Sequence, residues 1–306
     1  MSASKGQSLE LFFIDGKPDG MLTAEVFNWT GHVLMTPRTQ LTEALKRKEA
    51  AYTGVYLLLG EDQNSPLAYI GEGEDIRERI KKHDTAKDWW TTAVLITTAS
   101  NNLNKAHVKY LEARLIEEAR KIGRIPLDNS NTPARPSLTE AAQSNMETFL
   151  DYILMVLPAL RIDFLLTRTR PNKENSLIPD VTKNVMPIFE LHTPRHAISA
   201  IAHLVEGEFV VQAGSTARAG WKGKGTENSG YAKLFNELIE SGVLIMEGKC
   251  STFKENYAFK SPSAAAAVVN GRPANGTLEW KLQGSGQTYK EWEAKQLEQS
   301  NTQGVE

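Results

Sequence analysis

One acidic residue of this chain stands where a metal-binding carboxylate would be expected. Residues 103–123 read as a long helix that is closed by Gly123. Glu112 falls inside the apolar arc of this helix, and Lys105 projects from nearly the same side. The sequence therefore predicts either a buried ion pair or a carboxylate that holds a divalent cation.

A shorter helix, predicted in the segment EGEDIRERIKKHD, places two more reactive groups on one face. Arg79 and His83 share an arc of about 100° with Ile76 and Ile80, so we expect both on the buried side. Burying an unpaired charge costs on the order of several kcal/mol. The structural interpretation is an arginine paired with a carboxylate and a satisfied core histidine.

Two tyrosines lie on predicted strands beside glycines, which permit close backbone approach. They are Tyr56 in the triplet GVY and Tyr69 in the triplet YIG. A single strand tyrosine is more often a core residue than a catalytic one. The combination with the arginine, the histidine and the acid is what indicates chemistry.

This ordered set resembles the GIY-YIG nuclease superfamily over residues 51–133. The triplet YIG is intact, and GVY is a conservative variant of the first triplet. Arg79, His83 and Glu112 match the arginine, the histidine and the metal-binding glutamate of the family. Asn129 best matches the asparagine near the domain end, and Asn131 competes for that position.

Two features depart from the family pattern. Twelve residues separate the triplets, which implies a longer hairpin loop. Glu72 and Glu74 follow YIG, where many relatives carry small or basic residues, so the rim of the site is more acidic. Neither departure removes a candidate catalytic group.

The resemblance implies hydrolysis of DNA phosphodiester bonds with Mg²⁺ or Mn²⁺. Glu112 would hold the cation, and Arg79 would bind the phosphate as negative charge develops. Tyr56 would act as the general base, with its pKa lowered from about 10 by the cation and the arginine. The remaining candidates would orient these groups, brace the site or contact phosphate: Tyr69, His83, Asn129 and Lys105.

The elements that must position these residues are predicted in the order β-β-α-β-α, and the first two strands form a hairpin. This indicates a mixed α/β (α+β) fold class, with a small antiparallel sheet in the nuclease core and a second, smaller α+β domain. The expected segments are a strand-rich extension at 1–50, the nuclease domain at 51–133, a helical bridge at 134–184 with a linker from Pro171 to Asp180, the second domain at 185–293, and a polar tail at 294–306.

The second domain contains a glycine-rich basic loop with Arg218, Lys222 and Lys224. With Trp221 and Tyr231 nearby, this loop could follow a phosphate backbone and stack a base. A solvated basic loop is the alternative. The run SPSAAAAVVNGRPANGTLEW resembles an uncharacterised module attached to GIY-YIG nucleases, so we interpret this region as a DNA-targeting module.

Composition limits the possible function classes. With 41% hydrophobic and 24% charged residues, the chain is predicted to be globular rather than disordered. A net charge of −2 argues against a protein that coats nucleic acid nonspecifically. The single cysteine excludes an intrachain disulfide framework, and no apolar run suits a secretory signal or a membrane span. We expect a cytoplasmic protein without a membrane partner.

The predicted function is a Mg²⁺-dependent endonuclease in phage defence, restriction or DNA maintenance, with the strandedness of the substrate, and even RNA, left open. The alternative is a catalytically silent nucleic-acid-binding protein derived from a nuclease. A third interpretation, an interaction scaffold, would be favoured by a closed, solvent-excluded ion pair between Arg79 and Glu112.

Overall fold

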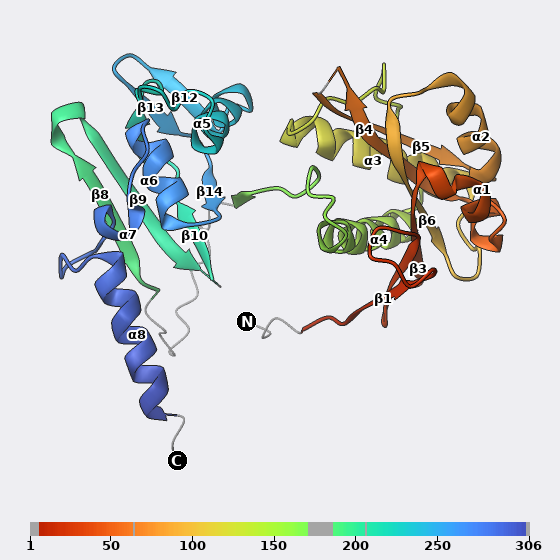
Figure 1. Ribbon diagram of the computed structural model, residues 1–306, viewed down its shortest axis with the longest axis horizontal. Coiled ribbons are helices and arrows are strands. Elements are labelled where there is room, and N and C mark those ends of the chain that lie inside the picture. Colours follow the sequence, from red (N-terminus) through yellow and green to blue (C-terminus); the bar gives the residue numbers. More distant parts are fainter. Residues whose placement is uncertain (1–5, 64, 171–185, 206, 304–306) are drawn as a thin grey trace. The chain divides into compact units, whose positions relative to one another are not determined.

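The structure is a computed structural model that describes residues 6–63, 65–170, 186–205 and 207–303. Its internal contacts divide the chain into two units, Met1–Leu166 and Thr167–Glu306. Figure 1 shows the elements of each unit. The expected linker from Pro171 to Asp180 lies outside the described residues.

The first unit contains one six-stranded antiparallel sheet. Its strands are β1 (Leu9–Phe13), β2 (Leu22–Val26), β3 (Gly31–Pro37), β4 (Gly54–Asp62), β5 (Ser65–Gly73) and β6 (Trp90–Thr98). Their order across the sheet is β1-β2-β3-β6-β4-β5. The strands expected ahead of the nuclease domain therefore extend its sheet, because β3 pairs with β6 along its whole length.

The predicted β-hairpin is present as β4 and β5. Tyr56 pairs with Gly71 in its register, and the ladder continues to the pair Asp62 and Ser65. The expected longer hairpin loop is therefore wrong. The added residues find partners across the hairpin, so they lengthen the strands instead of the loop.

The helices of the first unit are α1 (Leu41–Ala44), α2 (Ile76–Ala86), α3 (Lys105–Ile122) and α4 (Glu140–Ala159), with 3₁₀ turns at Arg38–Gln40 and Lys48–Ala51. Asp75 and Asn104 cap the starts of α2 and α3 by accepting backbone N–H groups. Gly123 ends α3 with φ +66°, as the sequence predicted. The expected order β-β-α-β-α is confirmed from β4 to α3.

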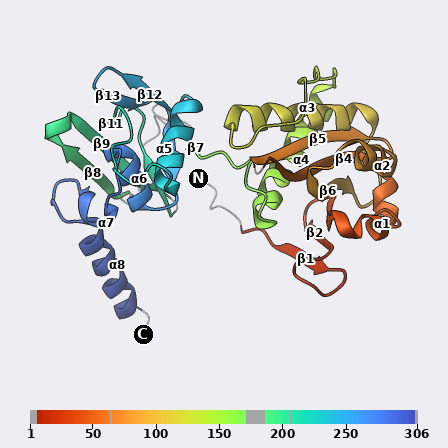
Figure 2. The ribbon, with the colours of Figure 1, turned by 45° about the horizontal axis from the view of Figure 1, so that its top comes forward.

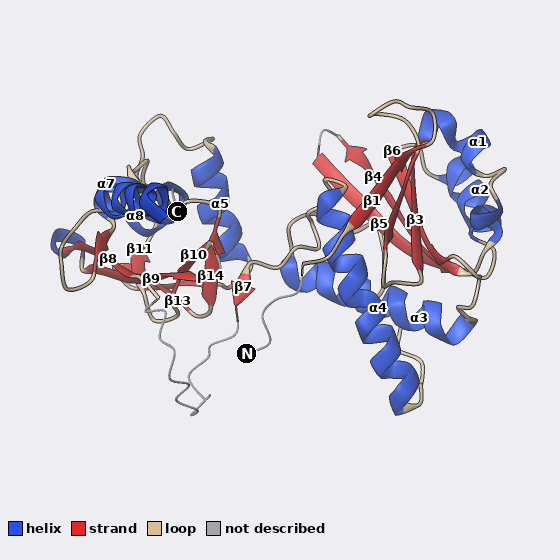
Figure 3. Ribbon diagram, turned by 90° about the horizontal axis from the view of Figure 1, so that it is seen from below, coloured by secondary structure: helices blue, strands red, loops and turns tan. Residues whose placement is uncertain are grey.

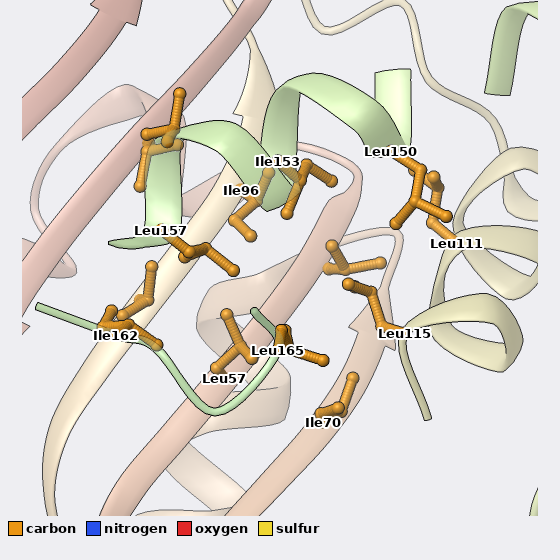
Figure 4. Packing of buried hydrophobic residues seen from close by; sticks show 14 of the residues in the cluster. Leu57, Ile70, Ile96, Leu111, Leu115, Leu150, Ile153, Leu157, Ile162 and Leu165 are labelled. Carbon is orange, nitrogen blue, oxygen red and sulfur yellow. The ribbon is translucent and has the colours of Figure 1, made fainter. Parts of the chain in front are cut away.

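The helices form layers on the two faces of this sheet (Figure 3). Residues of α1 and α2 belong to the core cluster that contains Tyr56. The opposite face of the sheet packs on α3 and α4. Figure 4 shows this second core, in which sheet residues meet residues of α3, α4 and the segment that follows: Leu57, Ile70, Ile96, Leu111, Leu115, Leu150, Ile153, Leu157, Ile162 and Leu165.

The outer edge of β5 is partly covered by the chain that follows α3. The N–H of Ala68 donates to the carbonyl of Pro126 (3.2 Å), and the N–H of Asp128 donates to the carbonyl of Ala68 (2.8 Å). These bonds form a short parallel bridge between Ala68 and Leu127. The bridge brings Asn129 next to the YIG triplet.

The second unit contains a six-stranded sheet in the order β15-β8-β9-β10-β14-β7 and a three-stranded sheet in the order β11-β13-β12. The strand pairs of both sheets are antiparallel. The strands are β7 (Thr169–Arg170), β8 (Ile188–Thr193), β9 (Ile198–Val205), β10 (Glu208–Val211), β11 (Thr216–Arg218), β12 (Leu244–Glu247), β13 (Cys250–Phe253), β14 (Asn256–Phe259) and β15 (Lys281–Leu282).

The helices of the second unit are α5 (Gly230–Glu240), α6 (Pro262–Asn270), α7 (Gly276–Glu279) and α8 (Tyr289–Gln303), with a 3₁₀ turn at Pro194–His196 (Figure 2). Ser261 caps α6 and Pro262 occupies its first turn, as the sequence predicted. The second unit reaches back to residue 167 because β7 pairs with β14.

The molecule thus has the expected mixed α and β composition. Where the structure describes the chain, no helix is both long enough and apolar enough to cross a bilayer.

Candidate active site

The two candidate tyrosines lie on the α2 side of the hairpin. Tyr56 is fully buried, with 0% of its surface exposed, whereas Tyr69 is half-buried. A Cβ atom at Gly71 would lie 2.4 Å from the hydroxyl of Tyr56. Residue 71 must therefore lack a side chain for the phenol of Tyr56 to lie across it, which gives the glycine of YIG a structural reason.

His83 of α2 contacts both tyrosines. Its Nε2 atom lies 2.8 Å from the hydroxyl of Tyr56, and its ring centroid lies 4.6 Å from that of Tyr69. Burial, together with the charges of Lys87 and Arg79, lowers the pKa of His83 to about 4. The imidazole is therefore neutral at pH 7 and can accept a proton from a neighbouring hydroxyl.

Burial raises the pKa of Tyr56, and the opposing effect of Arg79 is smaller. The lowering expected from Arg79 is therefore outweighed by burial, and the lowering expected from a bound cation stays a prediction. Burial also raises the pKa of Tyr69, and the negative charge of Glu112 adds to the increase. Because both pKa values lie above 10, Tyr56 and Tyr69 are protonated at neutral pH.

Arg79 shares with His83 the side of α2 that faces Tyr56, as predicted, but its side chain is exposed, so the prediction that it is buried is wrong. Its Nε atom donates to the backbone carbonyl of Glu72 (3.2 Å), and a Cβ at Gly73 would lie 2.8 Å from its Cγ. Its charge also acts on Tyr56 and Tyr69, so the side chain lies between the exposed surface and the tyrosines. The guanidinium therefore lies at the rim of the site.

Glu112 is half-buried on α3, near the same edge of the sheet. Burial raises its pKa to about 7, and the neighbouring charge of Glu72 is the next cause. Arg79 and Lys105 act in the opposite direction. Burial disfavours the charged form of Glu112, and a cation bound to the carboxylate would stabilise that form.

Lys105 forms its ion pair with Glu72 and not with Glu112. Its ammonium group lies 2.8 Å from both carboxylate oxygens of Glu72, which is 7% exposed. The ion pairs formed by the described residues include no contact between Arg79 and Glu112. The arrangement that would favour an interaction scaffold is therefore not found among them.

Asn129 binds the backbone of the YIG triplet from the far side of β5. Its Oδ1 atom accepts from the N–H of Ile70 (3.0 Å), and its Nδ2 atom donates to the carbonyl of Ile70 (2.7 Å). The side chain thus continues the bridge between Ala68 and Leu127 by one more pair of hydrogen bonds. Asn131, the competing position, is exposed.

Sequence reasoning missed a second ion pair at the site. Lys87 forms an ion pair with Asp128, and its ammonium group lies 4.9 Å from the centroid of the Tyr69 ring. Lys87 follows the last residue of α2 with an extended backbone, so helical spacing does not explain its position beside Tyr69. Asp128 carried no signal except its position next to Asn129.

The donor set of the site fits a largely hydrated Mg²⁺ ion. Within the described ranges, no group of three or more His, Cys, Asp or Glu side chains forms a candidate metal site. Mg²⁺ commonly uses one or two carboxylates and keeps several waters, so it needs no larger cluster. Glu112, with Glu72 close enough to raise its pKa, offers oxygen ligands of this kind.

The predicted basic residues of the second unit belong to one strand end and the loop that follows it. Arg218 ends β11, while Lys222 and Lys224 are exposed. The pKa of the half-buried His196 is lowered by desolvation and then by three arginines: Arg218, Arg195 and Arg272. The structure thus gathers around Arg218 two arginines that the sequence did not indicate, because they are distant along the chain.

The aromatic residues expected to stack a base near this loop have structural contacts. The Nε1 atom of Trp221 donates to the hydroxyl of Thr226 (3.2 Å), and its ring lies 6.3 Å from that of Phe235. Tyr231 packs against the same core. Neither observation shows a free stacking surface.

Comparison with known proteins gives one match. Residues 189–293 match the model of a domain of unknown function, DUF4357. No curated protein and no solved structure matches the chain. The match covers less than half of the sequence and lies inside the second unit. That part of the chain is therefore similar to DUF4357 domains, in agreement with the uncharacterised C-terminal module expected from the sequence.

Proposed function

We propose that residues 51–133 form a metal-dependent nuclease core of the GIY-YIG type. The observation that supports this most strongly is the meeting of Tyr69, Arg79 and Glu112 at the β5 edge, where each affects the pKa of another. A phenol, a guanidinium and a carboxylate of raised pKa form a donor set suited to a phosphodiester and a divalent cation.

The proposed role of each side chain follows from how exposed it is. Arg79 lies at the rim and binds the phosphate through its fixed donors. Glu112 binds the cation, which supplies positive charge for the developing phosphorane and the leaving oxygen. Tyr56 and His83 lie behind these groups, and their 2.8 Å hydrogen bond fixes the orientation of both rings.

Tyr69 is better placed than Tyr56 to take a proton from the attacking water. It is the half-buried member of the pair, whereas Tyr56 has no exposed surface. Glu112 raises the pKa of Tyr69, so neutralising that carboxylate removes one cause of the increase. The general-base role first expected for Tyr56 is therefore assigned to Tyr69 in this proposal.

The second unit is proposed to supply nucleic-acid affinity. Arg218, Arg195 and Arg272 lie close enough to His196 to lower its pKa together, and such a cluster attracts a phosphate backbone. Lys222 and Lys224 add exposed positive charge in the same loop region. A setting in phage defence, restriction or DNA maintenance, within the cytoplasm, rests on the family resemblance.

The second candidate function is nucleic-acid binding without cleavage. The specific observation in its favour is that burial raises the pKa values of both phenols. If no cation reaches Glu112, neither tyrosine can serve as a base at neutral pH.

A cleavage assay separates the two functions. The full chain is incubated with Mg²⁺ or Mn²⁺ and labelled single-stranded DNA, double-stranded DNA and RNA. Glu112→Gln is compared with Glu74→Gln, which removes an exposed carboxylate near the site. We expect the wild type and Glu74→Gln to produce cleavage products, and Glu112→Gln to lose at least about 100-fold in rate. Binding without products by all three proteins would contradict the nuclease and support the second candidate.

A further inference from the structure

The first unit contains a pocket of about 380 Å³, and neither Tyr56 nor Tyr69 is among the residues that line it. It is lined by the segment between β2 and β3, the end of β6, the start of α3 and one face of α4. This volume falls within the range of about 300 to 1,000 Å³ that is typical of small-molecule sites. The nuclease proposal assigns no role to it.

Three aromatic side chains form one wall of the pocket. Trp29 and Tyr152 are stacked, with ring centroids 5.7 Å apart and an interplanar angle of 13°. Phe149 is tilted against Trp29, with centroids 5.0 Å apart. A Cβ at Gly31 would lie 2.1 Å from atoms of the Trp29 ring, so the indole is held flat against the backbone. The wall is therefore preformed. Because the indole contacts both Gly31 and Tyr152, the half-buried Tyr152 is the ring that can offer a flat surface to a ligand.

The rest of the lining is mostly polar, with the imidazole of His107 and the apolar side chains of Leu103 and Met146. Amide side chains are supplied by Asn28, Asn102 and Asn145, and the described lining residues include no Asp, Glu, Lys or Arg. Trp29 adds a donor, since its Nε1–H group is buried without a hydrogen-bond partner. A buried donor that is left unpaired is unfavourable. The lining thus suits a neutral, planar ligand with donors and acceptors on its edge.

We propose that this pocket binds one unpaired nucleobase of the nucleic acid that the nuclease core would cut. Base faces stack on aromatic side chains, and asparagine amides can pair with base edges. The missing charge argues against a phosphate as the occupant. This inference deepens the proposed function and rests on it for the choice of nucleic acid as the ligand.

Helix α3 connects the pocket to the candidate catalytic site. His107 in its first turns lines the pocket, and Glu112 follows five residues later. At 1.5 Å and about 100° per residue, the two positions are roughly 7.5 Å apart along the helix axis and about 140° apart around it. A strand with a phosphate at Glu112 would therefore have to pass around α3 to place a base in the pocket, which favours an unpaired base that is not adjacent to the cleavage position.

Binding measured in EDTA tests the pocket without requiring cleavage. The full chain is titrated into a labelled short single strand of DNA and into a strand of equal length without bases. We expect the base-bearing strand to bind about 10-fold more tightly, which is the order of one stacked base. Tyr152→Leu should remove most of this preference and leave binding of the abasic strand unchanged.

Matched variants control for folding and for nonspecific effects. Phe27→Leu removes an aromatic ring that is 90% exposed in the same turn as Trp29, and it should keep the preference. Asn145→Ala should weaken the preference, whereas Gln143→Ala, also exposed on α4, should not. Because Asn145 is exposed, this variant tests the pocket even if Tyr152→Leu unfolds.

The outcomes separate this inference from the nuclease proposal. A base preference that is lost in Asn145→Ala supports the pocket, even when no protein in the cleavage assay yields products. Equal affinity of the wild type for both strands overturns the pocket, even when cleavage depends on Glu112. The pocket proposal is also overturned if the wild type binds neither strand, or if Asn145→Ala and a folded Tyr152→Leu keep the full preference.

Discussion

The two units of this chain present polar groups in opposite ways. In the first unit, Tyr69, Arg79 and Glu112 come from three different elements to one edge of a sheet, and burial shifts the pKa values of the tyrosine and the acid. In the second unit, Lys222 and Lys224 are exposed side chains in a glycine-rich segment. The first arrangement depends on geometry, whereas the second depends on the amount of positive charge.

This difference predicts how each unit tolerates substitution. A converging site loses function when one group changes shape, because the other groups are fixed by the fold. A dispersed basic surface loses affinity in proportion to the charge that is removed, and salt screens it. The predictions below test this contrast.

Exchanging arginine for lysine should give the largest difference between the two units. Arg79→Lys keeps the charge but loses the planar set of donors, and we expect the cleavage rate to fall by about 100-fold. Arg218→Lys should change nucleic-acid affinity by less than about 3-fold, because the positive charge remains. Single-turnover cleavage and equilibrium binding measure the two effects. Equal tolerance at both positions would remove the contrast between the units.

Removing the side chain of Asn129 should destabilise the first unit. Asn129→Ala loses both hydrogen bonds to Ile70, and we expect the free energy of unfolding to fall by roughly 2 kcal/mol. Asn131→Ala is the control, because Asn131 is exposed. Chemical denaturation provides the measurement. A similar loss in both variants would show that the contacts of Asn129 with β5 have no special importance.

Charge removal in the second unit should act through salt dependence. The double substitution Arg195→Gln and Arg218→Gln should weaken nucleic-acid binding by about 10-fold at moderate salt. It should also reduce the slope of log affinity against log salt concentration by about 2. Cleavage at saturating substrate should be unaffected. An unchanged slope would exclude contact between these arginines and phosphates.

The free energy of unfolding should depend on pH because the pKa of Glu112 is raised in the folded chain. Its pKa is raised from 4.5 to about 7 in the folded chain, so the folded state binds more protons than the unfolded state between these values. The free energy of unfolding should therefore fall as pH rises through this range. In EDTA, Glu112→Gln should lack this fall and exceed the wild type by about 1 kcal/mol at pH 8, after allowance for solvent screening. Parallel pH profiles would contradict the raised pKa.

Local pattern was sufficient to predict the elements that carry the candidate site. Apolar runs and capping residues predicted the hairpin, both helices and the closure at Gly123, because these depend on neighbouring residues. They did not predict that β1, β2 and β3 join the same sheet, since pairing between distant strands leaves no periodic signal.

Side-chain partners were harder to predict than elements. Helical spacing placed Arg79 on the side of α2 that faces Tyr56, but it did not show that the side chain is exposed. The partner of Lys105 is Glu72, 33 residues earlier, and no local rule relates the two. Likewise, Arg195 and Arg272 join Arg218 only through the tertiary fold.

The most direct test of the central claim is a crystal structure of the full chain with Mn²⁺ and a short strand whose phosphodiester resists cleavage. Our account predicts anomalous density for Mn²⁺ at about 2.1 Å from a carboxylate oxygen of Glu112. The guanidinium of Arg79 should contact the adjacent phosphate. Mn²⁺ bound elsewhere, with Glu112 making no contact to it, would contradict the account.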